Sequence, residues 1–194
     1  MKIIKHRINS ISELIKVPIN FGIEVDLSEF NGRIVTGHDP KENIADFQEW
    51  LSYFKHDQLA INIKQEGIEY EVIQILEKYE IRNFFLFDLS FPMIYKLSSH
   101  GEARIALRVS DLEGFQALEH FRDKVDWVWL DCFESASYIP AISKLLAGYK
   151  ICAVSSELHS EREIEVSDRI QSELESNRKH FTTICTKFPE RWLN

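Results

Sequence analysis

Residues 59–88 read LAINIKQEGIEYEVIQILEKYEIRNFFLFD, and this stretch decides the fold. It begins with an apolar run at Leu59–Lys64, which we predict to be a buried strand. Apolar residues then recur at helical spacing across Ile68–Tyr79. A second apolar run follows at Asn83–Asp88. Strand, helix and strand in this order, with short loops between them, predict two parallel strands joined by a crossover helix.

The same alternation of apolar runs and amphipathic stretches continues in both directions. Six further strands are predicted, at Lys2–His6, Gly22–Asp26, Ala103–Val109, Val125–Asp131, Lys150–Val154 and Phe181–Thr186. Six further helices are predicted, at Ile11–Val17, Ile44–Phe54, Pro92–Ser98, Leu112–Arg122, Tyr138–Leu146 and Glu161–Arg178. Strict alternation of this kind makes the strands parallel.

Eight such strands favour an α/β fold of the compact TIM-type (β/α)8 barrel, as a single domain over residues 1–194. An open doubly wound sheet is less favoured, because the chain has no GxGxxG phosphate turn. The sequence stops soon after the eighth strand, so we expect the last helix to be short or absent.

Composition and charge narrow the class of protein. The 194 residues carry 23 Lys plus Arg against 31 Asp plus Glu, a formal net charge of −8. This acidic balance argues against nucleic acid as a partner. No apolar run reaches the ~18 residues of a membrane span, and the first residues do not resemble a signal peptide. Three cysteines without CxxC spacing fit reduced thiols, so we expect a cytoplasmic protein. Nothing in the sequence decides the oligomeric state.

Polar side chains stand at the C-terminal ends of the predicted strands, where a barrel places its active site. Each of them alone is explained by a solvated loop, and lone histidines such as His159 are read as surface residues. When many polar side chains gather at one end of otherwise apolar strands, their removal from water costs free energy unless a ligand or metal compensates for it. Over the first three strands they are His6, Arg7, Glu24, Asp26, His38, Asn62 and Lys64, and later ends carry Asp88, Arg108, Asp131 and Ser155–Glu157.

The residue types in this group suit one kind of chemistry. Glu24 and Asp26 are two apart, hence on one face of a strand, and offer the hard oxygen ligands that Ca²⁺ and Mg²⁺ prefer. His6 and His38 can share acid and base work near neutral pH. The basic side chains beside them can stabilise the negative charge of a phosphate. These groups together indicate phosphodiester cleavage, in which one histidine deprotonates the attacking hydroxyl and the other protonates the leaving alkoxide.

The order of these residues resembles a known family. His6-Arg7, then Gly22–Asp26, then the stretch Gly32–Asp39 look like the opening of the glycerophosphodiester phosphodiesterases, which belong to the PI-specific phospholipase C-like barrels. Leu59–Lys64 resembles the third-strand motif of that family, and Ile184–Pro189 resembles the Thr-Asp-x-Pro of its eighth strand. The resemblance implies a barrel that hydrolyses a small glycerol- or sugar-type phosphodiester with a divalent metal, Ca²⁺ or Mg²⁺.

The resemblance also implies roles for individual residues, and the sequence departs from the family at several of them. Ile8 replaces a glycine, the Glu-Asn-Thr motif of the first helix is missing, and so is the insertion after the second strand. Asn62 replaces a metal-binding Glu, and Lys187 replaces an Asp. The implied roles are acid–base catalysis for His6 and His38, metal binding for Glu24, Asp26 and Asn62, and phosphate contact for Arg7, Lys64 and Lys187.

Three other readings stay open. A lyase of the same superfamily would stop at a cyclic phosphate and might dispense with the metal. A catalytically degenerate barrel would bind a phosphorylated ligand or a partner protein; Asn62 and Lys187 motivate this reading. Schiff-base chemistry on Lys64 is the third, and it leaves Glu24, Asp26 and His38 without a role.

Overall fold

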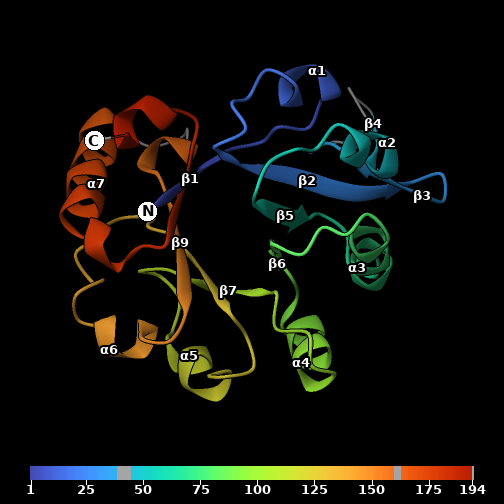
Figure 1. Cartoon of the computed structure of the whole chain (residues 1–194). Coiled ribbons are helices and arrows are strands. Elements are labelled where there is room, and N and C mark those ends of the chain that lie inside the picture. Colours follow the sequence, from blue (N-terminus) through green and yellow to red (C-terminus); the bar gives the residue numbers. More distant parts are fainter. Residues whose placement is uncertain (39–44, 160–162, 194) are drawn as a thin grey trace. The chain divides into compact units, whose positions relative to one another are not determined.

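The structure is a computed structural model that describes residues 1–38, 45–159 and 163–193 (Figure 1). Every one of the eight predicted strands is present in it, and the strands alternate with helices as predicted. By their contacts the residues form two compact units. The N-terminal unit comprises Ile4–Met93, and the C-terminal unit comprises Ile94–Asn194 together with Met1–Ile3. The single domain over residues 1–194 stays a prediction.

The N-terminal unit is built around the long strand β2. Strands β1 and β5 both pair with β2 in parallel, and β6 pairs in parallel with β5. Figure 1 shows α2 and α3 beside this sheet. The strands are β1 (Lys2–Lys5), β2 (Gly22–Phe30), β3 (Arg33–Thr36), β4 (Ala45–Asp46), β5 (Leu59–Ile63) and β6 (Phe84–Phe87). The helices are α1 (Ile11–Leu14), α2 (Phe47–Ser52), α3 (Glu69–Lys78) and α4 (Phe91–Ser99), the last of which begins in this unit and continues into the next.

The segment that decided the fold forms the predicted strand, helix and strand. All five residues of β5 and all four of β6 are buried, as expected of strands covered on both faces. Helix α3 connects them and buries Val72 and Leu76 completely, two residues that are one helical turn apart. The register sets Asn62 of β5 opposite Asp26 of β2, which brings two predicted metal ligands to the same level of the sheet.

A β-hairpin stands where the sequence analysis expected the second strand to end and a loop to follow. Strand β2 continues four residues past Asp26 to Phe30 and pairs antiparallel with β3. Asn31 and Gly32 make the turn with φ angles of 53° and 75°. Two consecutive positive φ angles are typical of the type I′ turn, and Asn-Gly is its preferred sequence. The predicted end of this strand was therefore wrong, and Asn31-Gly32 is the signal that was overlooked.

The C-terminal unit holds four parallel strands in the order β7-β8-β9-β10. The strands are β7 (Ala106–Val109), β8 (Trp127–Leu130), β9 (Lys150–Val154) and β10 (Thr183–Thr186). The helices are α5 (Gln116–His120), α6 (Ser143–Leu146) and α7 (Ile164–Ser176), all shorter than predicted, with 3₁₀ turns at η1 (Ser156–Leu158), η2 (Arg178–His180) and η3 (Pro189–Trp192). Only η3 follows β10 in the described residues, which matches the expected short last helix.

Apolar side chains fill the interior of the C-terminal unit. Trp127 and Trp129 of β8 are buried, so packing accounts for both. The three cysteines are buried free thiols, as predicted. None of the described helices has the length and apolar character needed to cross a membrane.

Candidate active site in the N-terminal unit

The predicted acidic pair lies in the middle of the N-terminal sheet. Glu24 and Asp26 of β2 are each only 1% exposed, and their spacing directs both side chains to the same face. Asn62, opposite Asp26 on β5, is also buried. Neighbouring residues of paired parallel strands point to the same side of the sheet. The fold therefore brings the three predicted metal ligands to one face of two adjacent strands.

Each of these three side chains has an oxygen that lacks a hydrogen bond. Oε1 of Glu24, Oδ1 of Asp26 and Oδ1 of Asn62 are buried and have no hydrogen-bond partner within the described residues. Buried polar atoms are nearly always satisfied, so the oxygens of Glu24 and Asn62 need an explanation, whereas Oδ1 of Asp26 has an ion-pair partner in Lys64 at 3.3 Å. Oxygen ligands of this kind suit Ca²⁺ or Mg²⁺. Within the described part of the chain, no three His, Cys, Asp or Glu side chains form a group that could hold a metal ion.

Two cationic side chains stand against Asp26. Nζ of Lys64 lies 3.3 Å from Oδ1, and Nε of Arg7 lies 3.4 Å from Oδ2. The backbone N–H of Arg7 also donates to Oε2 of Glu24 at 2.6 Å. Arg7 adopts a left-handed backbone with φ of 54°, which is costly for a residue other than glycine and directs this N–H at the carboxylate. Both cations therefore lie beside the same buried carboxylate.

Burial dominates the electrostatics of the acidic pair. Desolvation, followed by the negative charge of Asp26, raises the pKa of Glu24 to about 8, against opposing contributions from the Arg7 N–H, Lys64 and the Arg7 guanidinium. The charge of the neighbouring Asp26 disfavours ionisation of Glu24. Glu24 is therefore mostly protonated at neutral pH in the metal-free protein, and Asp26 is paired with Arg7 and Lys64.

The two predicted catalytic histidines differ in their surroundings. Nε2 of the largely buried His6 lies 3.6 Å from Oε2 of Glu24. His38 is exposed at the end of the hairpin. The preceding residue, Gly37, donates its backbone N–H to the carbonyl of Asp26 at 3.0 Å, which anchors the chain one residue before His38 to the strand of the acidic pair. Asp39, part of the family motif, lies outside the described residues.

Lys187, the last predicted site residue, belongs to the C-terminal unit. Its backbone N–H donates to Oε1 of Glu157 at 2.9 Å, and its Nζ lies 3.4 Å from the carbonyl oxygen of Glu157. The structure thus shows Lys187 in contact with η1. The other predicted site residues all lie in the N-terminal unit.

Asn9 is a site residue that the sequence analysis missed. Its Nδ2 donates to Oδ2 of Asp26 at 2.9 Å, and its Oδ1 accepts the backbone N–H of Asp26 at 2.9 Å. The hydroxyl of the buried Thr36 donates to the carbonyl of Asn9 at 2.6 Å. These bonds hold the Asp26 carboxylate through Oδ2, while Oδ1 faces the ammonium group of Lys64. The only signal in the sequence is a polar residue three positions after His6.

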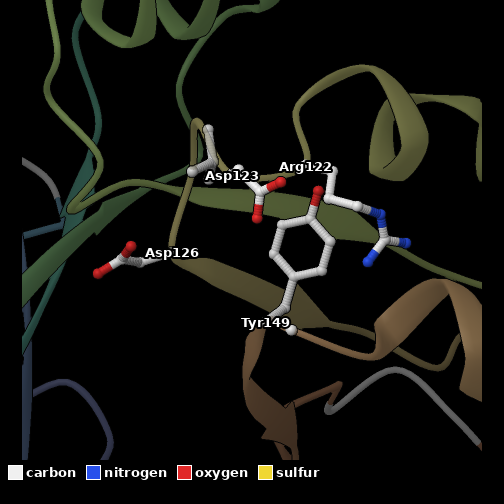
Figure 2. A pocket seen from close by; sticks show the side chains of 6 residues that line it. Arg122, Asp123, Asp126 and Tyr149 are labelled. Atoms are coloured by element: carbon white, nitrogen blue, oxygen red, sulfur yellow. The ribbon is translucent and has the colours of Figure 1, made fainter.

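A small polar pocket lies at the N-terminal ends of β8 and β9 in the C-terminal unit (Figure 2). It has a volume of about 280 Å³ and is lined by Arg122, Asp123, Val125, Asp126, Gly148 and Tyr149. The Arg122 guanidinium donates to the carbonyls of Ala147 and Leu145, and the Tyr149 hydroxyl donates to the carbonyl of Leu118. Because these groups already bond main-chain carbonyls of α5 and of the C-terminal end of α6, we assign the pocket no ligand.

Two solved structures with similar folds are named as glycerophosphodiester phosphodiesterases. A protein assigned as a glycerophosphoryl diester phosphodiesterase from Agrobacterium tumefaciens strain C58 aligns with a TM-score of 0.68 at 12% identity, over 98% of this chain and 95% of that one. A glycerophosphodiester phosphodiesterase from the same strain aligns with a TM-score of 0.62 at 15% identity, over 95% of this chain and 96% of that one. The predicted α/β fold of the TIM-barrel type is thereby confirmed.

A third similar structure has a different kind of name. A glycerol uptake operon antiterminator-related protein from Thermotoga maritima aligns with a TM-score of 0.51 at 16% identity, over 98% of this chain and 97% of that one. No protein-family profile and no curated protein sequence matches this chain. At these identities the likeness shows the fold alone, and function must be argued from the site.

Proposed function

We propose that this protein is a metal-assisted phosphodiester hydrolase that acts on a small glycerol- or sugar-type phosphodiester. The observation that carries the proposal is the set of three buried oxygens from Glu24, Asp26 and Asn62 on one face of β2 and β5. They have no hydrogen-bond partner in the described residues, and Oδ1 of Asp26 has an ion-pair partner in Lys64. The likeness in fold to two glycerophosphodiester phosphodiesterases adds support.

The metal in this proposal is Ca²⁺ or Mg²⁺, held by the three oxygens. Carboxylate and amide oxygens are the donors that both cations take in proteins. A bound cation would supply Lewis-acid stabilisation of a phosphoryl oxygen. It would also oppose the effects of burial and of the Asp26 charge, which together raise the pKa of Glu24. An amide in place of a third carboxylate lowers the charge of the site, so we expect weak rather than tight binding.

The residues around this face would divide the remaining work. The cationic groups of Arg7 and Lys64 lie within 3.4 Å of Asp26 oxygens. In the proposed function they would pair with the phosphate of a substrate bound beside Asp26. His6 and His38 would exchange protons with the attacking hydroxyl and the leaving alkoxide. His6 is oriented by its proximity to Glu24, whereas His38 stands exposed on the hairpin, where a substrate can reach it. The phosphate contact of Lys187, which belongs to the C-terminal unit, stays a prediction.

Hydrolysis of a panel of phosphodiesters tests this function. The panel combines glycerophospho-alcohols, sugar phosphodiesters and an aryl diester, each assayed with Ca²⁺, Mg²⁺, Mn²⁺ or chelator. We expect metal-dependent turnover, with a loss of at least ~10²-fold in His6→Ala and in His38→Ala and none in His120→Ala. Substantial activity in either of the first two variants would refute the assignment of the histidines. A cyclic phosphate seen by phosphorus NMR would indicate a lyase.

A phosphate-binding protein without catalysis is the second candidate. The ion pairs favour this second candidate, because Arg7 and Lys64 balance the negative charge of Asp26 without any metal. Well-folded protein that binds glycerol phosphate at this site and turns over no diester, with any cation, would decide for this reading.

A further inference from the structure

A second group of polar side chains stands at the C-terminal ends of β7 and β8, within the C-terminal unit. Asp131 directly follows β8 and is only 3% exposed. Its Oδ1 accepts hydrogen bonds from the backbone N–H of Cys132, at 3.1 Å, and from Nε2 of His159. Arg108 of β7 places Nη2 3.4 Å from the other oxygen, Oδ2. A buried carboxylate is thus held between an imidazole and a guanidinium.

The contact with Asp131 fixes the tautomer of the neutral histidine ring. An ionised carboxylate only accepts hydrogen bonds, so Nε2 of His159 carries the proton. In the neutral ring, Nδ1 then carries the lone pair and is a proton acceptor. The ring packs on Phe133, with 4.9 Å between the ring centroids, and the side chain is 25% exposed. His159 is therefore an oriented, accessible acceptor rather than the plain surface residue that the sequence suggested.

Arg108 provides a cation beside this acceptor. Its guanidinium lies 5.4 Å from the centroid of the same Phe133 ring, and its side chain is 38% exposed. Arg108 also lies near Glu113, whose Oε2 is 3.6 Å from Nε and whose side chain is 46% exposed. Ion pairs this exposed are weak, so an anionic ligand can take the place of Glu113. The fork of guanidinium donors suits a phosphate or carboxylate.

We propose that Arg108, Asp131 and His159 form a binding site for a small hydroxylated anion. The anionic group pairs with Arg108, and a hydroxyl of the ligand donates to Nδ1 of His159. The place in the fold supports this site, because α/β barrels bind their ligands at the C-terminal ends of the strands. The site lies wholly within the C-terminal unit and does not depend on the proposed hydrolase function.

NMR of the histidine rings tests the proposal on the intact protein. Glycerol 3-phosphate and glycerate are titrated into the protein in separate experiments. Inorganic phosphate and glycerol, the two component parts of glycerol 3-phosphate, are the controls. We expect a saturable shift of the His159 ring signals with at least one of the two hydroxylated anions and none of the exposed His120. Arg108→Gln should weaken binding at least about tenfold, whereas Arg104→Gln, which removes a positive charge paired with Glu102, should not. Glu113→Gln should tighten binding, because it removes the competing carboxylate.

Several results would overturn this site. They are the absence of a saturable His159 shift with both hydroxylated anions, unchanged binding in Arg108→Gln, and weaker binding in Glu113→Gln. Equal affinity for inorganic phosphate would refute the hydroxyl contact with Nδ1. Nitrogen chemical shifts give a check that needs no ligand: a ring of His159 protonated mainly on Nδ1 would contradict the geometry on which the proposal rests.

Discussion

Asn62 contributes a neutral amide to the candidate metal site, so the site carries less negative charge than it would with a carboxylate at this position. Its orphaned oxygen completes a set with those of Glu24 and Asp26. An amide can coordinate a hard cation, but it brings no charge of its own. The balance between metal affinity and the stability of the metal-free protein should therefore depend on this position.

Asn62→Asp is expected to move these two properties in opposite directions. A third carboxylate should raise the affinity for Mn²⁺ or Ca²⁺ about tenfold, a gain of ~1.4 kcal/mol. In the metal-free protein the added charge lies beside Asp26 in a buried position, so the free energy of unfolding should fall by ~1–3 kcal/mol. Calorimetric titration and urea unfolding with chelator measure the two effects. Unchanged metal affinity in a folded variant would contradict the ligand role of residue 62.

Asn9 should act on the metal through Asp26 without touching it. Asn9→Ala removes both hydrogen bonds that fix the Asp26 carboxylate and main chain. We expect Mn²⁺ affinity to fall at least about tenfold at temperatures where the variant is fully folded. Ser12→Ala, in the neighbouring helix α1, is the matched control and should bind Mn²⁺ as the wild type does. A variant that is only less stable, with unchanged Mn²⁺ affinity, would reduce Asn9 to a structural role.

The sequence predicted strands and helices correctly where the spacing of apolar residues was regular. Leu59–Lys64, Ile68–Tyr79 and Asn83–Asp88 became β5, α3 and β6, because apolar spacing reports burial directly. The extension of β2 depended instead on turn chemistry at Asn31-Gly32.

Contacts between distant residues lay beyond any local pattern. Asn9 and Asp26 are 17 positions apart, and Asp131 and His159 are 28 apart. Their pairing is decided by how strands and loops are placed side by side. The Glu24–Asp26 pair was predictable because both residues lie on one strand, whereas the residues that orient such groups were not.

A single carboxylate links two elements of the C-terminal unit. Glu157 in η1 accepts hydrogen bonds from the hydroxyl of Ser155 and, across to β10, from Thr186 Oγ1 at 2.5 Å and the backbone N–H of Lys187 at 2.9 Å. Burial alone would raise the pKa of Glu157, but these donors lower it below its ordinary value. The carboxylate is therefore ionised in the folded protein at neutral pH.

Glu157→Gln tests this link between η1 and β10. An amide oxygen accepts more weakly than a carboxylate, and the amide NH₂ would face donors, so we expect a loss of ~1–3 kcal/mol in the free energy of unfolding at pH 7. Glu165→Gln, on the exposed face of α7, is the control and should change stability little. Equal stability of the two variants, measured by urea unfolding, would show that the link contributes nothing.

The stability of the whole protein should respond to pH through a buried histidine. His56 is buried in the N-terminal unit, and its Nε2 donates to the carbonyl of Val17 at 3.2 Å. Burial lowers the pKa of His56 below its ordinary value of 6.5, and the bond to Val17 only partly opposes this. Above pH 6.5 the ring is neutral in both the folded and the unfolded chain, so its titration has no effect there. Below pH 6.5 the unfolded chain binds a proton that the folded protein resists, and stability falls.

Urea unfolding at pH 7.5 and at pH 5.5 isolates this contribution when it is compared between variants. The net charge of −8 becomes less negative on acidification, which acts on every variant alike. His56→Gln cannot be protonated, so it should lose less stability than the wild type between the two pH values. His120→Gln, at an exposed position, should follow the wild type. If His56→Gln kept the full pH dependence of the wild type, the acid sensitivity would have to come from groups other than this buried ring.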